Sequence, residues 1–459
     1  MKHRPGAAHN ILEALQFFPA FPANGILHRG ALHRTRILLH IIHEFSLYDT
    51  CLWKAGLQSK TGASRPIFPT RFPANLLVLN GPATQTFAVT VYSSWNCKQP
   101  GHIATRSVLQ ERAISPEISP KNGLDRLESD GHKMQYLVTG GAGFIGGFLC
   151  ERLIAEGHHV TVLDNMSTGK YDNVAHLDGQ ERFRLIIDSV TNERLAEDLV
   201  RGCDAIVHLA SAVGVKLIMD RPVQVIETIF QGTDTILRLA SRYRKLVMIT
   251  SSSEVYGKSE NVPFREDGDR LEGPTSKHRW AYACAKALDE FLALAHWKET
   301  RLPVICVRLF NTVGPRQTGQ YGMVVPRFVQ AALSGESLIV HGDGKQSRCF
   351  CHVEDVVEAL VGLLSCKAAH GLVVNVGTDQ EISILDLANQ IIATTQSKST
   401  IKHISYDAAF GEGFEDMRRR VPSLERIHQL IGWRPKRNLD TIIRDVALTI
   451  RSSMPSNGS

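Results

Sequence analysis

The chain has 459 residues, which is enough for two or three domains, and a hydrophobic content of 43%, which is ordinary for a globular protein. Its formal net charge of +6 resides in residues 1–133, where basic side chains exceed acidic ones by seven, while the rest of the chain has a balance of −1. This distribution gives no basis for nucleic-acid binding, and the lack of any apolar run of about 20 residues argues against membrane insertion.

Residues 1–133 show neither a strand period nor a helix period, because Pro, Gly, Ser and Asn interrupt each short apolar run. We expect this extension to be disordered, to be a targeting leader, or to lie outside the native product, and we assign no fold to it. The last alternative is attractive because Met134 stands immediately before the first predicted strand. An N-terminal peptide from native cells that maps well upstream of Met134 would contradict it.

From Met134 onward, apolar β-branched runs alternate with helix-period segments, which is typical of a parallel sheet covered on both faces. We predict an α/β fold of the doubly wound Rossmann type over residues 134–318, a smaller α/β substrate-binding lobe over 319–452 and a tail over 453–459. The predicted strands are 135–139, 159–163, 184–187, 205–209, 246–250 and 303–308. The predicted helices are 144–156, 192–201, 223–241 and 281–299, followed in the second lobe by 350–364 and 384–394.

The residues after the first strand form a glycine-rich loop at which strand turns into helix. Gly140 permits a tight turn, Gly143 lets the backbone approach a pyrophosphate, and Gly146 allows close packing of the helix on the sheet. Phosphates at this point would meet the N–H groups of the helix N-terminus, which favour anions. We therefore predict a dinucleotide site at Gly140, Gly143, Phe144, Ile145 and Gly146.

An acidic residue ends the second strand, at the offset from the glycines that a dinucleotide site requires. The carboxylate of Asp164, followed by Asn165, would accept hydrogen bonds from the adenosine ribose and would repel a 2′-phosphate. This pattern favours NAD over NADP as the cofactor. Asp188 closes the third strand, and for it a turn residue and a contact to the adenine amino group are equally good interpretations.

A phenol and an ammonium group stand four residues apart in the sequence Tyr282-Ala283-Cys284-Ala285-Lys286, which places both on one helix face. A lysine cation, together with a nicotinamide ring, would lower the pKa of the tyrosine toward the range useful for a general base. The serines that end the fifth strand lie at the edge where doubly wound folds bind ligands, so one of them can hold a substrate oxygen. The alternative is that these serines cap a turn.

The nine cysteines are scattered without paired spacing, which indicates free thiols in a reducing compartment, and we expect a cytoplasmic protein. The segment Cys349–His352 is the one cluster that suggests metal ligands. A zinc site needs a second ligand pair at loop spacing, which the sequence does not provide, so we predict no metal.

These motifs together resemble the extended short-chain dehydrogenase/reductases that modify nucleotide sugars, from about Gln135 to the mid-440s. The resemblance implies NAD as cofactor, a nucleotide-sugar substrate of the UDP type, and a homodimer. It also implies that Ser252 and Ser253 contact the sugar, that Asn311 meets the diphosphate and that Arg348 contacts the phosphates. The motifs that carry it are Thr139–Gly146, Ser251–Gly257, Tyr282 with Lys286, Arg308–Pro315 and Gly342–Arg348.

The reaction depends on a few side chains that follow the catalytic hydroxyl. In the family that this chain resembles, dehydratases carry an Asp-Glu pair, whereas here Ser253 precedes Glu254, which makes dehydration less favoured. The hydroxyl-Ser-Glu order is similar to that of UDP-glucuronate decarboxylases, in which the arginine matching Arg420 is a proposed general acid. We therefore predict catalysis by Tyr282, Lys286, Ser252, Glu254 and Arg420. The alternatives are a nucleotide-sugar 4-epimerase, a 4,6-dehydratase or a non-catalytic NAD-binding regulator, and a solvated surface position for Arg420.

Overall fold

The computed structural model describes residues 77–80, 86–89, 133–212, 214–319, 323–410 and 415–454. The chain divides into two units, residues 1–114 and 115–459. In the first unit, strands β1 (Leu77–Asn80) and β2 (Thr86–Val89) pair in the antiparallel sense. The rest of the N-terminal extension, and with it the choice among its three interpretations, lies outside the described residues.

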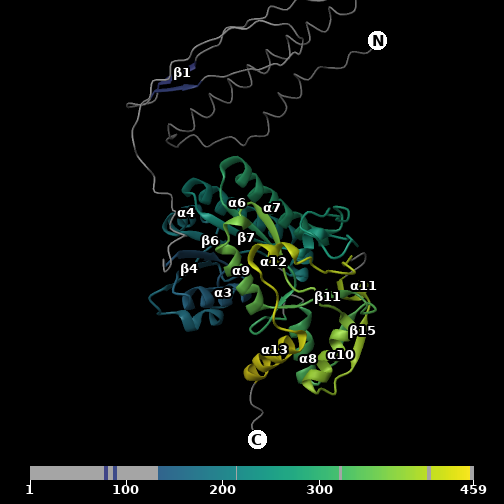
Figure 1. The fold of residues 1–459 in the computed structure, drawn as a ribbon. Coiled ribbons are helices and arrows are strands. Elements are labelled where there is room, and N and C mark those ends of the chain that lie inside the picture. The colour runs from purple at the N-terminus through teal and green to yellow at the C-terminus, as the bar shows by residue number, and fades with distance from the viewer. Residues whose placement is uncertain are drawn as a thin grey trace, which may run out of the picture. The chain divides into compact units, whose positions relative to one another are not determined.

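A parallel sheet of seven strands forms the centre of the second unit, as expected for a Rossmann-type α/β fold (Figure 1). All six predicted strands are present, and their pairs are in register over four to six residues. The strand order reverses next to β3, and this switch point is where doubly wound folds bind ligands. Across the sheet the strands are β13 (Leu372–Val376), β8 (Val304–Leu309), β7 (Leu246–Ser252), β6 (Ala205–His208), β3 (Gln135–Thr139), β4 (His159–Asp164) and β5 (Phe183–Ile187).

Helices cover both faces of the sheet because alternate strand residues point to opposite sides. In β3, Tyr136 and Val138 join one apolar cluster, whereas Leu137 joins the cluster on the other face. Residues of the first cluster come from α3 (Phe144–Ala155), α9 (Val353–Leu364) and α12 (Glu425–Ile431). Residues of the second come from α4 (Glu193–Gly202), α6 (Pro222–Tyr243) and α7 (Ala281–Thr300).

Two predicted features differ from the structure. The sheet has a seventh strand, β13, which pairs in parallel with β8 although more than 60 residues separate them. The helix predicted from Phe350 begins instead at Val353, because Cys351 and His352 form a short strand, β12 (Cys351–His352), beside β9 (Thr312–Val313). The His352 side chain then caps α9 by accepting a hydrogen bond from the Glu354 N–H.

A third apolar cluster lies in the C-terminal part of the chain, and its residues come from elements outside the main sheet. It is built mainly from helices that pack around the parallel pair β10 and β15. The predicted helix 384–394 is present as α10. The elements of this part of the chain are α8 (Val324–Ser334), β10 (Leu338–His341), β11 (Ser347–Cys349), β14 (Glu381–Ser383), α10 (Ile384–Thr395), β15 (Ile401–Ile404), α11 (Tyr406–Phe410) and α13 (Leu439–Ser453).

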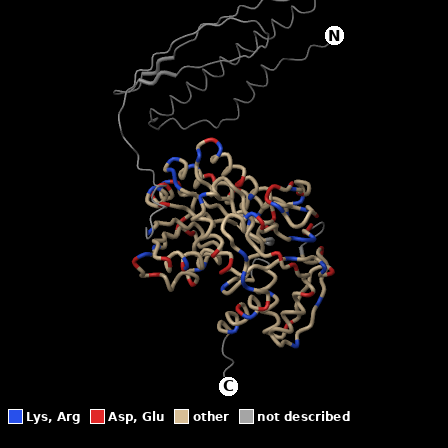
Figure 2. The backbone as a smooth tube through the Cα atoms, viewed as in Figure 1, with Lys and Arg blue, Asp and Glu red and all other residues tan. Residues whose placement is uncertain are grey.

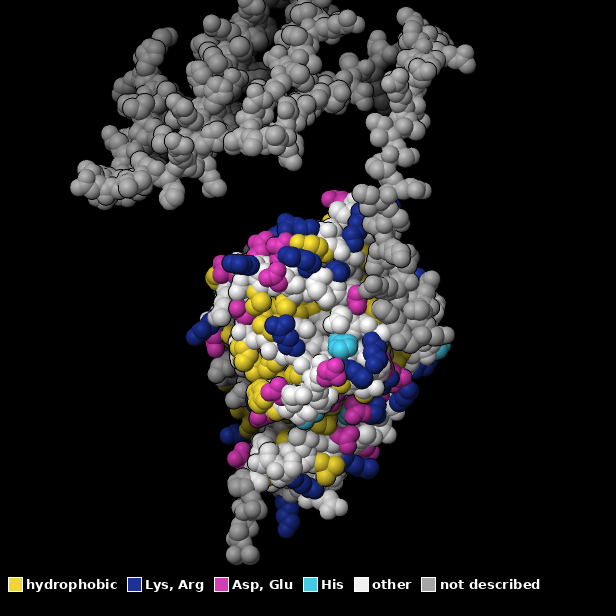
Figure 3. Space-filling view, turned by 90° about the vertical axis from the view of Figure 1, so that its left-hand side faces the viewer, with side chains coloured by type: hydrophobic (Ala, Val, Ile, Leu, Met, Phe, Trp, Pro, Cys, Tyr) yellow, Lys and Arg dark blue, Asp and Glu magenta, His cyan; other side chains and the backbone are white. Residues whose placement is uncertain are grey.

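Charged residues of both signs are interspersed along the described backbone rather than separated into a basic and an acidic side (Figure 2). On one face, hydrophobic side chains gather among charged ones (Figure 3). None of the helices in the described part of the chain is long and apolar enough to cross a membrane.

Candidate active site

One cleft of about 880 Å³ brings together all sixteen residues that the sequence predicts for the site. It extends along the carboxyl ends of the central strands and reaches the C-terminal elements. The predicted residues on its lining are Gly140, Gly143, Phe144, Ile145, Gly146, Asp164, Asn165, Asp188, Ser252, Ser253, Glu254, Tyr282, Lys286, Asn311, Arg348 and Arg420.

The glycine loop is shaped for an anion at the start of α3. Gly140 has a φ of 72°, which only glycine adopts without strain, and Gly143 precedes the first turn of the helix. A Cβ added at Gly146 would lie 2.4 Å from the Gly140 carbonyl oxygen. The loop and helix can therefore approach this closely only without side chains. The exposed N–H groups at the helix start fit a pyrophosphate.

The acid at the end of β4 is fixed beside this loop. One oxygen of Asp164 accepts a hydrogen bond from the Ala142 N–H at 3.0 Å, and the other accepts one from the Met166 N–H at 2.8 Å. Burial raises the pKa of Asp164, and the two backbone hydrogen bonds act in the opposite direction. A carboxylate held in this way on the cleft wall fits the predicted acceptor for ribose hydroxyls.

Asn165 and Asp188 line the same end of the cleft, and both also make local hydrogen bonds. Asn165 Oδ1 accepts from the Ser167 N–H, and the two oxygens of Asp188 accept from the Ser189 N–H and from the side chain of Asn192. The turn interpretation of Asp188 is thus visible in the structure. Its contact to an adenine stays a prediction.

Tyr282 lies in the first turn of α7 and lines the cleft together with Ser252, which ends β7. Burial raises the pKa of Tyr282 above its ordinary value, Glu254 adds to the increase, and the Ser252 hydroxyl opposes it. The ammonium of Lys286 donates to the Thr250 carbonyl oxygen at 2.8 Å. The predicted effect of Lys286, together with a nicotinamide ring, on the pKa of Tyr282 stays a prediction.

Glu254 is clamped between two buried arginines. Its carboxylate lies 2.5 Å from Arg279 Nη1 and 2.7 Å from Arg420 Nη2. Burial opposes the ionisation of Glu254, but Arg279 and Arg420 outweigh it and hold the pKa of this carboxyl well below its ordinary value. Arg420 therefore occupies the site rather than the surface, and it also contacts Asn311 Oδ1 at 3.4 Å.

Arg348 extends this network toward the C-terminal elements. It pairs with Asp416 at 2.7 Å and donates to the carbonyl oxygens of Ser347 and Met417. Asp416 also lies 3.7 Å from Arg279. Three guanidinium groups thus face two carboxylates, so the network has one excess positive charge, which suits an anionic ligand.

Two members of the network, Arg279 and Asp416, were not predicted as site residues. Arg279 lies in a short 3₁₀ turn, His278–Trp280, three residues before Tyr282, so the spacing along one helical face was a usable signal. Asp416 follows residues 411–414, which the structure does not describe, and only the fold brings it to the cleft. Ser253 is 1% exposed, and its Oγ has no hydrogen-bond partner among the described residues.

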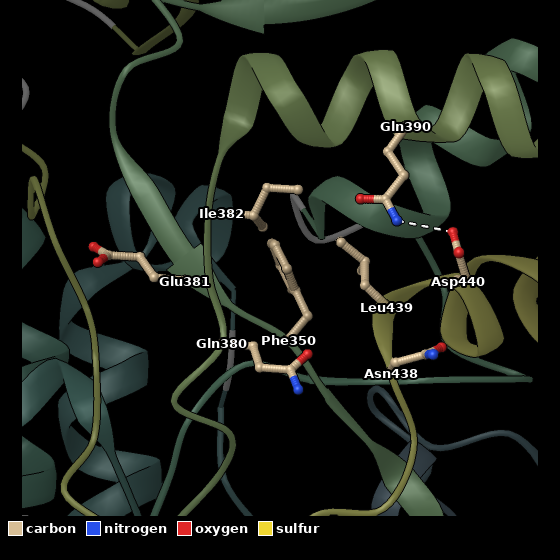
Figure 4. A pocket seen from close by; sticks show the side chains of 8 residues that line it. All are labelled: Phe350, Gln380, Glu381, Ile382, Gln390, Asn438, Leu439 and Asp440. Atoms are coloured by element: carbon tan, nitrogen blue, oxygen red, sulfur yellow. Dashed lines mark hydrogen bonds between the residues drawn. The ribbon is translucent and has the colours of Figure 1, made fainter.

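A smaller hollow of about 280 Å³ lies among the C-terminal elements, and none of the predicted site residues lines it (Figure 4). Its polar groups bond locally, as Gln390 does to Asp440 at 2.8 Å, and Glu381 pairs with Arg419. Within the described ranges no group of three metal-binding side chains occurs, and Cys349 and Cys351 are free thiols.

The glycine loop, the acid after β4 and the Tyr282/Lys286 pair at the switch point of a parallel sheet define an extended short-chain dehydrogenase/reductase of the NAD-dependent nucleotide-sugar group. Residues 137–446 match the family described as GDP-mannose 4,6 dehydratase. Because this match covers more than half of the chain, the protein belongs to that family.

Three known proteins illustrate the similarity. A UDP-N-acetyl-alpha-D-glucosaminuronate decarboxylase from Bacillus cytotoxicus is 42% identical over 304 residues, which are 66% of this chain and 93% of the relative. A UDP-glucuronic acid decarboxylase 1 from Xenopus tropicalis is 36% identical over 325 residues, 71% of this chain and 73% of the relative. The structure of a UDP-glucuronic acid 4-epimerase from Bacillus cereus, in complex with UDP-glucuronic acid and NAD, superposes with a TM-score of 0.63 at 25% identity. The superposition covers 70% of this chain and 99% of that one.

Proposed function

We propose that this chain decarboxylates a UDP-hexuronate, with UDP-glucuronate as the first candidate, through a 4-keto intermediate. The observation that carries the proposal is the buried pairing of Glu254 with Arg279 and Arg420 beside the Tyr282 phenol. The similarity to two uronate decarboxylases supports it.

The first step requires a general base and a group that orients the sugar hydroxyl at C4. Tyr282 accepts the proton from this hydroxyl, while Ser252, which lines the same cleft, orients the oxygen. NAD bound along the glycine loop supplies the acceptor for the hydride that leaves the same carbon. The closely packed loop at Gly146 and the carboxylate of Asp164 support this choice of cofactor.

The second step follows from the chemistry of the 4-ketone. The ketone turns the carboxylate on C5 into a β-keto acid, so the bond between C5 and the carboxylate carbon breaks to give carbon dioxide and an enolate. A cation beside the enolate oxygen stabilises the charge that develops there. We assign this role to Arg420 and, with it, the supply of the proton that C5 then takes up. Burial lowers the pKa of Arg420, while Glu254 acts in the opposite direction.

The excess positive charge of the network supports an acidic sugar over a neutral one. Arg279 and Arg420 are both less than 9% exposed, and the Nε atom of each has no hydrogen-bond partner among the described residues. A buried guanidinium with a donor to spare is stabilised by a carboxylate that brings its own acceptors. A neutral sugar would leave these donors unsatisfied.

The test is incubation of the purified chain with NAD and each of three substrates: UDP-glucuronate, its 2-acetamido counterpart and UDP-glucose. We expect carbon dioxide from at least one uronate, and no carbon dioxide and no turnover with UDP-glucose. Conversion of UDP-glucose to UDP-galactose without release of carbon dioxide from either uronate would replace the proposal with the 4-epimerase alternative. The Tyr282→Phe variant, which keeps the ring and removes the base, is the matched inactive control.

We also propose that the enzyme is a homodimer that associates through α6 and α7. These two helices pack against each other and carry apolar side chains that are 37–66% exposed, namely Val223, Ile226 and Phe230 on α6 and Leu288 and Phe291 on α7. Large apolar side chains exposed on two neighbouring helices are typical of an interaction surface. Light scattering of Phe291→Glu should give the monomer mass, and a wild-type chain that is itself monomeric would contradict the proposal.

We place the enzyme in the cytoplasm. The seven cysteines among the described residues are all free, and most of them are buried. Free thiols fit a reducing compartment. Fractionation of native cells tests this placement, and recovery in a secreted fraction would contradict it.

A further inference from the structure

A buried acid, Asp289, pairs with Lys286, the lysine of the proposed catalytic set. Asp289 lies one helical turn after Lys286 on α7, and its Oδ2 is 3.3 Å from the lysine Nζ. Their side chains are only 1% and 3% exposed, respectively. Lys286 is the only cation that forms an ion pair with Asp289 within the described part of the chain.

The neighbouring acid, Glu290, does not pair with Lys286. Glu290, the next residue along α7, receives two hydrogen bonds from Arg308, at 2.9 and 2.8 Å, and one from Ser251 at 2.5 Å. The partners of Glu290 therefore lie on the strands of the sheet, whereas Asp289 pairs with Lys286. Two adjacent buried carboxylates thus have different partners, one structural and one within the proposed site.

The other groups around Lys286 contribute no second anion among the described residues. From β7, Thr250 offers its carbonyl oxygen at 2.8 Å, and from β6, His208 is buried and hydrogen-bonded to Thr139 of β3 at 2.7 Å. Burial, reinforced by the nearby Lys286, lowers the pKa of His208 to about 3, so this ring is neutral. From α6, the hydroxyl of Thr233 approaches Asp289.

An ammonium group has three donors, and the structure accounts for two of them. Thr250 and Asp289 take one each, which fixes the rotation of the ammonium. The third donor is left for an acceptor in the cleft, which Lys286 lines. Without Asp289, the ammonium would keep a single fixed bond and could turn away from the cleft.

We propose that Asp289 is a positioning residue, which holds the Lys286 ammonium so that its remaining N–H points to a hydroxyl of the bound dinucleotide. This inference rests on the proposed function, in which Lys286 belongs to an NAD site. The negative charge of Asp289 has a second, opposing effect, because it raises the pKa of the Tyr282 phenol. Substitutions of Asp289 can therefore separate its effect on the position of Lys286 from the effect of its charge on Tyr282.

Two variants test the proposal, with binding of NADH followed by fluorescence and with the pH dependence of kcat/KM. Asp289→Asn keeps an acceptor oxygen but removes the charge, so NADH affinity should be nearly retained while the acid limb of the pH profile moves down by roughly one unit. Asp289→Ala removes both, and its Kd for NADH should rise about tenfold. The matched control is Asp198→Asn, an exposed aspartate that pairs with Arg201 at the same helical spacing, and it should change neither quantity.

Wild-type NADH affinity in Asp289→Ala would overturn the proposal whatever the acid limb of Asp289→Asn shows, because the acid limb reports the charge of Asp289 and not the position of Lys286. If Asp289→Ala does not fold, Asp289→Leu, which has nearly the size and shape of aspartate but no acceptor, replaces it in the NADH measurement. Tyr282→Phe, measured in parallel, distinguishes a failure of the proposed function from a failure of the proposed role of Asp289. If it stays active, the proposed function falls, whereas NADH binding by the Asp289 variants still tests the pairing with Lys286.

Discussion

The replacement of Arg420 by methionine is the sharpest test of the proposed chemistry. The methionine side chain preserves much of the apolar stem of arginine and removes the guanidinium, which is 2.7 Å from Glu254 and 3.4 Å from Asn311. The loss of one donor that stabilises a developing oxyanion typically costs a factor of about 10² to 10³ in kcat. We expect this loss in decarboxylation and not in the oxidation that precedes it.

The structure also bounds the effect of this change on stability. An orphaned buried charge costs about 3–5 kcal/mol. In Arg420→Met, however, Glu254 keeps its partner Arg279 at 2.5 Å. The free energy of unfolding should therefore fall by less than that amount, and the variant should fold.

The assay follows carbon dioxide from UDP-glucuronate labelled in its carboxyl group, and the absorbance of NADH, in one single-turnover reaction. Arg420→Met should form NADH at the wild-type rate and release carbon dioxide much more slowly. The matched control is Arg419→Met, one residue away, because Arg419 is exposed and pairs with Glu381 at 2.6 Å. Wild-type release of carbon dioxide by Arg420→Met, or an equal loss in both variants, would refute the assignment.

Three further predictions concern the cofactor site and the charge network. Gly146→Ala should abolish NAD binding, measured by calorimetry, because its Cβ would lie 2.4 Å from the Gly140 carbonyl oxygen; normal affinity would show that the loop can yield. Asp164→Asn should weaken NAD binding and reduce the preference for NAD over NADP, measured as the ratio of their Kd values, and an unchanged ratio would argue against a ribose contact. Glu254→Gln should be less stable than the wild type at neutral pH. Because the folded-state pKa of Glu254 is lowered, its contribution is complete above the ordinary value of 4.5 and is lost as the pH falls toward the folded-state pKa, so the melting temperatures should converge in acid; a constant gap would contradict this.

Much of the fold could be predicted because its signals are local. Each predicted strand of the sheet is a short β-branched run, and the glycine loop identifies the first turn by itself. The strand β13 has the same composition, Leu-Val-Val-Asn-Val, but it follows α9 after the chain has visited the C-terminal elements. Only pairing with β8, which is a long-range contact, reveals its place at the edge of the sheet.

The charge network was only partly predictable, because its members are distant in sequence and similar in type to surface residues. Arg418, Arg419 and Arg420 are indistinguishable by composition, yet the first two are exposed and the third is 7% exposed. No periodicity in this segment separates them. Which of the three arginines is buried is determined by the backbone on either side of Arg420, which the fold holds in place.

That backbone explains how a C-terminal arginine reaches a site built on β7. The residues that follow Arg420 pair with Phe264: the Phe264 N–H donates to the Val421 carbonyl oxygen at 2.7 Å, and the Ser423 N–H donates to the Phe264 carbonyl oxygen at 2.8 Å. The Phe264 ring stacks on Tyr256, with centroids 4.5 Å apart, and Tyr256 is the last residue of the 3₁₀ turn that carries Glu254.

The two sides of the Glu254–Arg420 pair are thus attached to one stacked aromatic pair, whose rings are only 1–2% exposed. Arg308 of β8 lies over the Tyr256 ring at 4.6 Å and ties this pair to the central sheet. A shift of the C-terminal segment would therefore have to break buried packing before it could separate Arg420 from Glu254. On this argument the guanidinium is pre-organised, and its contribution to catalysis does not require a closing motion of the C-terminal elements.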